Sequence, residues 1–192
     1  MPLIPWIEDA EATGLVAEVY GRWKRANPDR EKVPGILKCL SSRPDLLEGV
    51  FELSYPLLFS DGFLTRRVKE MLATYVSALN ECPYCAGSHA YFLSVQEGQP
   101  LADSLKRLDL ETPLITDAER ALLRFARLVT LEGNRNSPGE IARLHELGWV
   151  DNQISEAVYV TALYAFFNRV ANAYGLEDPQ YHLTLKRNEA AG

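Results

Sequence analysis

The chain has 192 residues, of which 47% are hydrophobic and 24% charged, and its formal net charge is −6 at neutral pH. This composition is typical of one globular domain and excludes a disordered chain. The negative charge disfavours nucleic acid or an anionic membrane surface as a partner. The N-terminus lacks the features of a signal peptide, and the longest apolar run, residues 157–167, is about half of the ~20 residues that span a bilayer. We therefore expect a single-domain cytoplasmic protein.

Helix signals dominate along the chain, and strand signals are scarce. Asn27-Pro28 ends the first predicted helix, and Pro44 suits the first turn of another. Residues 116–119 and 137–140 have the capping-box pattern, and Asp151 is expected to cap the last long helix. The predicted elements are a helix over 9–26, two short helices within 34–59, an amphipathic helix over 64–79, and helices over 83–97, 116–132, 137–148 and 151–175. The sequence therefore predicts an all-α bundle with a core over about 9–175 and a polar tail over 176–192.

Residues 81–90, ECPYCAGSHA, hold two of the three cysteines and one of the three histidines. Pro83 suits a first helical position, which makes Cys82 the expected N-cap and places Cys85 in the first turn. Cys82, Cys85 and His89 then share one helix face. The positive end of the helix dipole lowers the pKa of a nearby thiol. A thiolate with a partner thiol one turn away and a histidine for the proton has what peroxide reduction or disulfide exchange requires.

Other interpretations of this motif remain open. The two cysteines could form half of a zinc site, although His145 and His182 are not at finger-like spacing. They could also be inert core residues, since free cysteine packs as a small hydrophobe, and His89 could be a core histidine. The string CPYC resembles the active site of glutaredoxin, but that fold needs strands that alternate with helices, and none is predicted before Cys82.

Glu70 is predicted to face His89. The helices over 64–79 and 83–97 are joined by a short turn, and residues equidistant from such a turn are neighbours in an antiparallel hairpin. Glu70 lies opposite the apolar stripe of its helix, on a face of small residues that includes Ser77. We expect this second face to be partly buried and to carry the site. The alternative is a solvated surface carboxylate.

The spacing Glu70-x11-Cys82-x2-Cys85-x3-His89 resembles that of the alkyl hydroperoxidase D-like group of the carboxymuconolactone decarboxylase superfamily. The resemblance extends from about residue 33, through RPDLLEGVFELSYPLLF and LTRRVKEMLATYVSALNECPYCAGSHA, to FFNRVANAYG. It implies an all-α fold and homo-oligomers, often trimers or hexamers. It also implies thiol-dependent reduction of hydroperoxides with no bound metal, haem or other cofactor. The reductant would be an external dithiol, such as a lipoyl group or a thioredoxin-like protein.

The resemblance also assigns roles to the four residues of the motif. It implies that Cys85 attacks the peroxide and that Cys82 resolves the product as a disulfide. It implies that Glu70 and His89 relay the proton. Decarboxylase chemistry is disfavoured, because the decarboxylase members of the superfamily typically lack the cysteine pair.

Further residues are candidates for weaker roles. The best-known members carry a histidine where this chain has Tyr84, and a phenol with a pKa of ~10 cannot replace that base near neutral pH. Tyr84, Ser77 and Ser88 are candidate supporting residues around the motif. Cys39 has no partner in the sequence and is expected to be a packing residue. Asn168-Arg169 matches a recurring pair of the family and is interpreted as a buried polar contact or a subunit-interface pair.

Two other functions are retained as alternatives. The protein could be a thiol–disulfide oxidoreductase or a redox sensor without significant peroxidase turnover. Residues 137–158, SPGEIARLHELGWVDNQISEAV, have the pattern of a DNA-binding helix–turn–helix. Basic residues are sparse in its second helix, and the net charge of the chain disfavours it.

A homo-oligomer is also predicted from packing. The small-residue face of the helix over 64–79 and the apolar run over 157–167 offer more packing surface than a monomer should need.

Overall fold

The structure is a computed structural model, and residues 2–181 are described. Within them the chain forms helices joined by loops, without strands, which confirms the predicted all-α class. The elements are α1 (Gly14–Ala26), α2 (Gly35–Lys38), α3 (Pro44–Phe59), α4 (Arg66–Leu79), α5 (Pro83–Glu97), α6 (Gln99–Lys106), α7 (Asp117–Glu132), the 3-10 helix η1 (Gly133–Arg135), α8 (Pro138–Glu146) and α9 (Asp151–Ala173). No helix of this part of the chain is long and apolar enough to cross a membrane. The last residues of the predicted tail, 182–192, lie outside the described residues.

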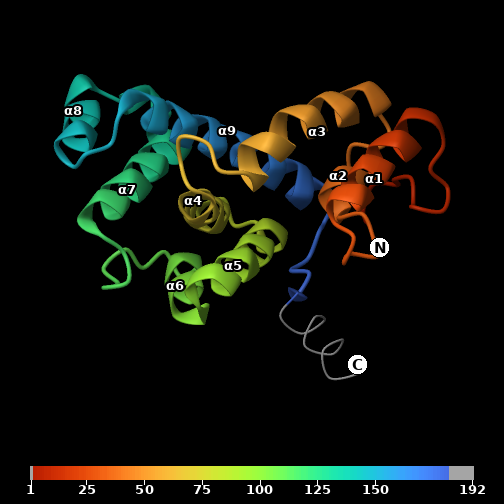
Figure 1. Ribbon diagram of the computed structural model, residues 1–192, viewed down its shortest axis with the longest axis horizontal. Coiled ribbons are helices and arrows are strands. Elements are labelled where there is room, and N and C mark those ends of the chain that lie inside the picture. Colours follow the sequence, from red (N-terminus) through yellow and green to blue (C-terminus); the bar gives the residue numbers. More distant parts are fainter. Residues whose placement is uncertain (1, 182–192) are drawn as a thin grey trace.

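The α4 helix is at the centre of the bundle, where Figure 1 shows it nearly end-on. α9 crosses on one side of it, α5 and α6 lie on the other, and α7 and α8 form one end of the molecule (Figure 1). α1, α2 and α3 form the opposite end. Every residue of α4 from Val68 to Ser77 is buried. The central helix is therefore the element on which most of the others pack.

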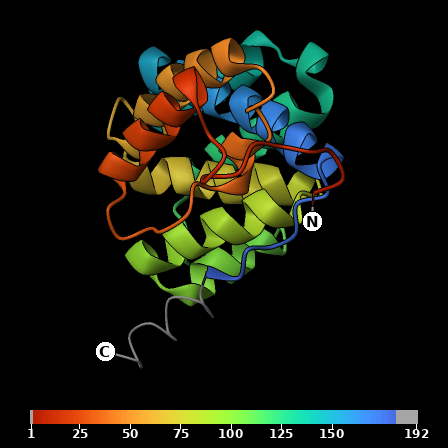
Figure 2. The ribbon, with the colours of Figure 1, turned by 90° about the vertical axis from the view of Figure 1, so that its right-hand side faces the viewer.

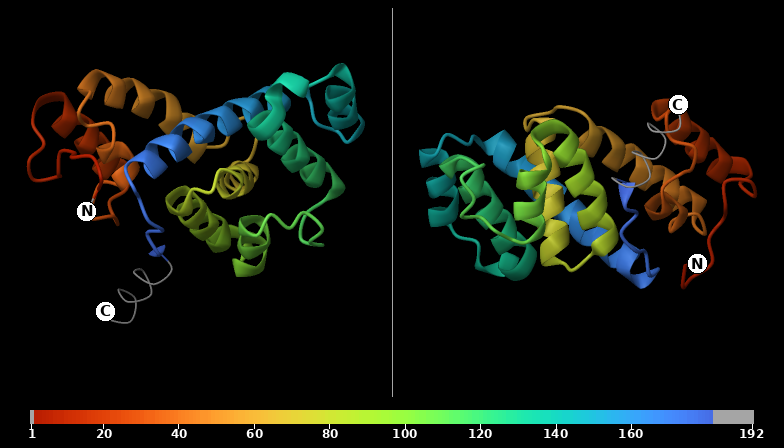
Figure 3. Two further views of the ribbon diagram at one scale, coloured as in Figure 1. Left: turned by 180° about the vertical axis from the view of Figure 1, so that it is seen from behind. Right: turned by 90° about the horizontal axis from the view of Figure 1, so that it is seen from below.

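α4 and α5 form the predicted antiparallel hairpin, and they lie side by side in Figures 2 and 3. Thr65 caps α4, because its side chain accepts a hydrogen bond from the N–H of Val68. Cys82 is the N-cap of α5 and Pro83 lies in its first turn, as predicted. The hairpin thus places the cysteine motif directly against the central helix.

Two of the predicted caps differ from the structure. The capping box of α7 forms between Thr116 and Glu119, as predicted. Ser137 is the N-cap of α8 but makes no capping hydrogen bond through its side chain. The N-cap of α9 is Val150 rather than Asp151, and its N–H donates to the side chain of Gln153. The Asp151 carboxylate instead pairs with a neighbouring helix, which a local pattern does not show.

Tertiary contacts shift the start of the first helix, whereas α5 ends where the sequence predicts. The first helix begins at Gly14 rather than near Asp9, because the Asp9 carboxylate accepts a hydrogen bond from the N–H of Val33 and pairs with Lys24 and Lys38. Gly98 follows the last residue of α5, and its φ of +85° is a conformation that favours glycine. The helix therefore ends where the sequence predicts. A helix that the sequence analysis did not predict, α6, follows immediately.

A buried ion pair joins α4 to α9 beneath the loop that precedes α4. Lys69 Nζ lies 2.7 Å from Glu156 Oε1 and donates to the backbone carbonyls of Leu57 and Ser60. The other carboxylate oxygen of Glu156 accepts the N–H of Leu64 at 2.6 Å. These bonds satisfy both charges and fix the end of α4 that carries Glu70.

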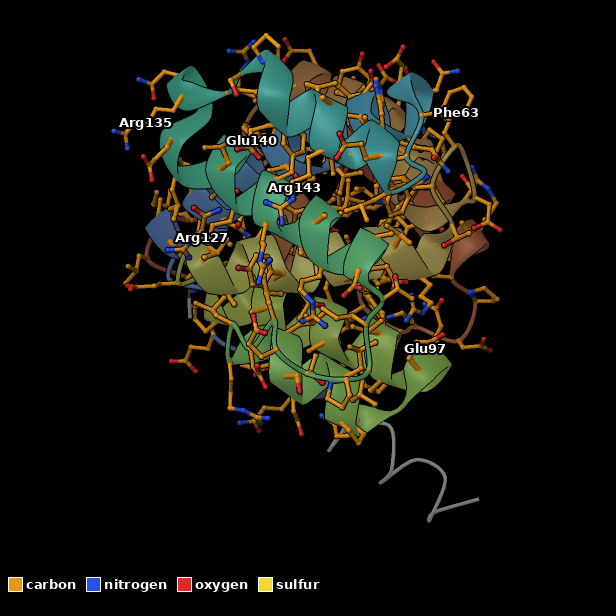
Figure 4. All side chains as sticks on the ribbon, turned by 90° about the vertical axis from the view of Figure 1, so that its left-hand side faces the viewer. Phe63, Glu97, Arg127, Arg135, Glu140 and Arg143 are labelled. Carbon is orange, nitrogen blue, oxygen red and sulfur yellow. The ribbon has the colours of Figure 1, made fainter. Side chains whose placement is uncertain are left out.

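The structure does not favour the helix–turn–helix interpretation. Its second helix is α9, a helix of 23 residues whose buried side chains include Ile154, Ala157 and Val160. This helix packs along α4 and α7 as part of the core. The outer surface near α8 carries both signs of charge, with Glu140 beside Arg143 (Figure 4). This end of the molecule lacks the basic face of a DNA-binding module.

Most of the surface from which an oligomer was predicted is buried within the chain itself. The small residues of α4, Ala73, Thr74 and Ser77, are buried within the chain itself. Most of the apolar run over 157–167 is also buried or half-buried against the other helices. The small-residue face is therefore not free for a second subunit, and within the apolar run only Tyr159 and Ala162 are exposed. The oligomer stays a prediction that rests on the family resemblance.

Candidate active site

Glu70 and His89 are neighbours across the α4–α5 hairpin, as the sequence predicts. His89 Nδ1 lies 2.6 Å from Glu70 Oε2, and only 1% of the Glu70 surface is exposed. The alternative of a solvated carboxylate is therefore wrong. A buried carboxylate at this distance holds the imidazole ring in one orientation, with the Nδ1 proton directed toward it.

Two residues that the sequence analysis did not assign extend this pair. Arg66, one turn before Glu70, donates from Nε to Glu70 Oε1 at 2.6 Å. Tyr164, from α9, places its hydroxyl 2.8 Å from His89 Nε2. With the Nδ1 proton on the Glu70 side, His89 Nε2 has no proton and accepts a hydrogen bond from the Tyr164 hydroxyl. The result is a continuous chain of hydrogen bonds from Arg66 through Glu70 and His89 to Tyr164.

Tyr164 is fully enclosed by the bundle, and this affects its acidity. Burial raises its pKa well above the usual value, and the negative charges of Glu70 and Cys85 act in the same direction. The phenol therefore keeps its proton and can act as a hydrogen-bond donor to His89. A buried tyrosine needs a hydrogen-bond partner for its hydroxyl. A tyrosine within an apolar run was therefore the feature of the sequence that could have indicated Tyr164 as a site residue.

The two cysteines of the motif are reduced and buried, but they differ in acidity. A hydrogen bond from the Cys85 thiol lowers the pKa of Cys82 to about 7, with further help from backbone N–H groups at the start of α5 and from the side chain of Asn168. The same bond, together with burial, raises the pKa of Cys85 well above its usual value. The pair therefore shares one proton, which stays on Cys85 after Cys82 has ionised.

Asn168 lies behind the cysteines as a buried polar contact, one of the two roles predicted for it. Its Nδ2 donates to Ser77 Oγ at 3.0 Å, and its Oδ1 accepts from Asn80 at 2.9 Å. Its side chain also favours the thiolate form of both cysteines. Arg169 points away, since its side chain is exposed and bonds to a backbone carbonyl of α9.

A cavity of about 280 Å³ opens next to these groups. Cys85, Ser88 and His89 line it, and Cys82 is not among the lining residues. Its other walls are mainly apolar and aromatic: Trp23, Pro34, Ile36, Leu37, Phe51, Tyr55, Leu58, Phe59, Tyr84, Phe92, Tyr164, Phe167 and Tyr181. Cys85 is thus the cysteine that a small molecule in the cavity would meet.

The other described residues singled out in the sequence lie in the cavity wall, in the core or at the surface. Tyr84 is a buried wall of the cavity whose pKa is raised well above the usual value, chiefly by burial, so it cannot act as a base. Cys39 is a core residue, and burial raises its pKa to about 12. His145 lies at the surface, 2.8 Å from Asp151, and His182 lies outside the described residues. Across residues 2–181, no three His, Cys, Asp or Glu side chains are grouped so that they could hold a metal ion.

Together these groups supply the elements of thiol redox chemistry. One sulfur faces a cavity large enough for a small organic molecule, and a second sulfur lies within hydrogen-bonding distance behind it. A buried carboxylate–imidazole–phenol chain can move a proton at the cavity wall. The structure thus brings together all four residues of the sequence motif and adds Tyr164, Arg66 and Asn168.

Comparisons with known proteins show what the sequence and the fold are similar to. Residues 44–99 match the model of the carboxymuconolactone decarboxylase family. A peroxidase-related protein from Ralstonia eutropha JMP134, described as an alkylhydroperoxidase AhpD core, is 28% identical with a TM-score of 0.80, over 95% of this chain and 97% of its own. A peroxidase-related protein from Silicibacter sp. TM1040 is 24% identical with a TM-score of 0.81, over 94% and 96%.

A third solved structure shares the fold at lower identity. The debrominase Bmp8, in complex with 2,3,4-tribromopyrrole, is 15% identical with a TM-score of 0.76, over 97% of this chain and 99% of its own. No curated protein matches the sequence. Residues 44–99 thus match the carboxymuconolactone decarboxylase family, and the fold of the chain is that of the alkyl hydroperoxidase D-like, peroxidase-related proteins.

Proposed function

We propose that the protein reduces organic hydroperoxides with its cysteine pair and is restored by an external dithiol. The observation that carries the proposal is the position of Cys85, which faces the cavity next to His89 while Cys82 lies directly behind it. The peroxidase-related description of the similar structures supports it. Glu70, His89 and Tyr164 would supply protons at the cavity wall.

The first step oxidises Cys85. The Cys82 thiolate takes the proton of the Cys85 thiol along the hydrogen bond that joins them, and this leaves Cys85 as the nucleophile. The Cys85 sulfur then attacks the terminal oxygen of the hydroperoxide, so that an S–O bond forms and the O–O bond breaks. The alkoxide that leaves takes the proton of the Tyr164 hydroxyl, and a proton taken up from solvent at His89 Nε2 then restores the phenol. The products are an alcohol and the sulfenic acid of Cys85.

The second step forms the disulfide. The Cys82 sulfur attacks the sulfenic acid of Cys85, the S–S bond forms, and the hydroxyl leaves as water with the Cys82 proton. Residues three apart on one helical turn have Cα atoms ~5–6 Å apart, which a disulfide tolerates. An external dithiol then reduces the disulfide by exchange and is itself oxidised to a disulfide.

A second candidate function is thiol–disulfide exchange without peroxide turnover. The pKa of about 7 at Cys82 favours it, since the more acidic thiol of such a pair is the better attacking group near neutral pH. In that case Cys82 rather than Cys85 would be the first nucleophile. The position of Cys82 disfavours this role, because its sulfur is buried and does not line the cavity, so that a disulfide could not reach it without a local opening of the structure.

The test measures hydroperoxide consumption by purified, metal-free protein with lipoyl and thioredoxin-like dithiols. We expect turnover that is lost in Cys85→Ser, and a fall from three free thiols to one after mild peroxide treatment. Cys39→Ser serves as the control, since Cys39 is not among the residues that line the cavity. Retention of all three thiols in excess peroxide would exclude both redox functions. Disulfide formation without turnover by any dithiol would favour the second.

A further inference from the structure

A cation, Arg30, lines the cavity and lies among aromatic rings. It belongs to the loop after α1, and no carboxylate among the described residues pairs with it. Its guanidinium carbon lies 4.3 Å from the ring centroid of Tyr181, 5.7 Å from that of Phe92 and 5.8 Å from that of Trp23. The rings hold the group in place but do not neutralise its charge.

The other charged groups around the cavity are already satisfied. Arg66 is paired with Glu70, and the Glu70 carboxylate itself is bonded to His89 behind the cavity wall. No Asp or Glu side chain appears among the lining residues. A cavity with a positive lining is notable in a chain with a net charge of −6. The excess of positive charge is therefore a local property of this cavity.

A second polar group is available at the reactive end. Ser88 is 95% buried, since only 5% of its surface is exposed, and it lines the cavity one turn after Cys85. Its Oγ has no hydrogen-bond partner among the described residues. A buried hydroxyl without a partner is costly, and a bound polar group would remove that cost. Ser88 thus marks where the polar end of a ligand would lie, next to the Cys85 sulfur.

Arg30 and the reactive end are close enough for one small molecule to contact both. The Phe92 ring, which contacts Arg30, also lies 5.5 Å from the His89 ring centroid. The walls between the two polar ends are aromatic and aliphatic. The complementary ligand has an apolar body, one anionic group for Arg30 and one polar reactive group for Ser88 and Cys85.

We propose that the cavity selects hydroperoxides of organic acids, with the substrate carboxylate paired to Arg30 and the hydroperoxide group at Ser88 and Cys85. This rests on the proposed peroxidase function. A planar guanidinium matches a carboxylate in a two-bond geometry, and a single arginine suits one negative charge rather than the two of a phosphate monoester. The aromatic walls match a phenyl or alkyl body.

The first arm of the test measures binding with molecules that cannot react. The probes are 4-isopropylbenzoate and 4-isopropylbenzyl alcohol, which share a skeleton and differ in charge, with Trp23 fluorescence or calorimetry as the signal. We expect the carboxylate to bind wild type about tenfold to a hundredfold more tightly, as a charge-assisted hydrogen bond would give. Arg30→Gln should remove most of this ratio, and Arg30→Lys should retain part of it. Arg25→Gln, an exposed arginine of α1, is the matched control and should keep the wild-type ratio.

The second arm compares turnover of cumene hydroperoxide with that of its para-carboxylate. We expect a lower KM for the carboxylate in wild type and a loss of this difference in Arg30→Gln. Equal binding of the acid and the alcohol to wild type, or an unchanged ratio in Arg30→Gln, would overturn the proposed selectivity. A carboxylate preference in binding with no turnover of either hydroperoxide would support the selectivity and refute the peroxidase function alone.

Discussion

At the N-terminus of α5, two sulfur atoms three residues apart experience different surroundings. Cys82 accepts a hydrogen bond and ionises first, with a pKa of about 7. Cys85 keeps its proton but is the one that borders the cavity. The acidic sulfur and the accessible sulfur are therefore not the same. A proton transfer between them is what would make Cys85 reactive near neutral pH.

Alkylation by a small thiol reagent should report this shared proton. Because the pKa of Cys82 is lowered, the pair should carry one negative charge above about pH 7 and lose it as the pH falls below that value. We expect the alkylation rate to rise with a midpoint near pH 7 in wild type. Cys82→Ser should shift the midpoint upward, and Cys39→Ser should not. A wild-type midpoint near that of a free thiol, ~8.5, would contradict the assignment.

Removal of the Glu70 charge tests the proton relay. Glu70→Gln keeps the shape of the side chain but weakens its hold on the His89 imidazole. General acid–base catalysis of this kind typically contributes about 10²–10⁴-fold. We expect a peroxidase rate at least about tenfold lower near neutral pH and a raised apparent pKa for alkylation.

Control variants distinguish the loss of the proton relay in Glu70→Gln from a general effect on folding. Glu52→Gln removes an exposed carboxylate of α3 that pairs with Arg22, and it should leave the rate unchanged. His89→Ala should lower the rate about as much as Glu70→Gln, and the double variant should be far from additive, since both residues act in one relay. An alkylation profile of Glu70→Gln that superimposes on wild type would show that Glu70 does not act on the thiols.

At the scale of elements, the α4–α9 contact carries both the site and a buried ion pair. Glu156→Gln removes the charge that balances Lys69, whose side chain is only 2% exposed. The loss of one partner of a buried pair typically costs roughly 3–5 kcal/mol, because the other charge stays buried. We therefore expect a large fall in the free energy of unfolding, measured by urea denaturation. Glu111→Gln, which breaks an exposed pair with Arg124, should have little effect. Equal stability of the two variants would contradict this account.

At the scale of the whole molecule, the cavity is assembled from both ends of the chain. Residues of α1, α2 and α3 line it together with residues of α5 and α9, and the segment after α9 passes beside α5 (Figure 1). Arg30, from the first sixth of the sequence, meets Phe92 and Tyr181 there. The site therefore requires the complete fold rather than the α4–α5 hairpin alone.

The assembly state is also a property of the whole molecule. The family resemblance implies a trimer or hexamer, and the chain exposes several large apolar side chains, among them Leu53, Phe63 and Tyr159. Sedimentation equilibrium at micromolar concentration should show a species larger than the monomer. A single monomeric species under these conditions would contradict the prediction.

The sequence by itself determined the helical class, most helix boundaries and the four residues of the motif. These features depend on local periodicity, on proline and capping residues, and on spacing along a hairpin. Glu70 and His89 could be paired because a short turn leaves two antiparallel helices little freedom in their register. The helix α6 was missed, because Gly98 and a proline mark a break equally well whether a loop or a helix follows.

Only the tertiary structure decided which groups meet from distant parts of the chain. Tyr164 and Asn168 reach the site because α9 crosses the central helix, and Arg30 reaches the cavity because the loop after α1 meets α5 at Phe92. The acidity of Cys82 and the accessibility of Cys85 likewise depend on burial and on partners that local sequence does not fix. Side-chain contacts between elements arise from packing, and helix periodicity specifies which face is buried but not what lies against it.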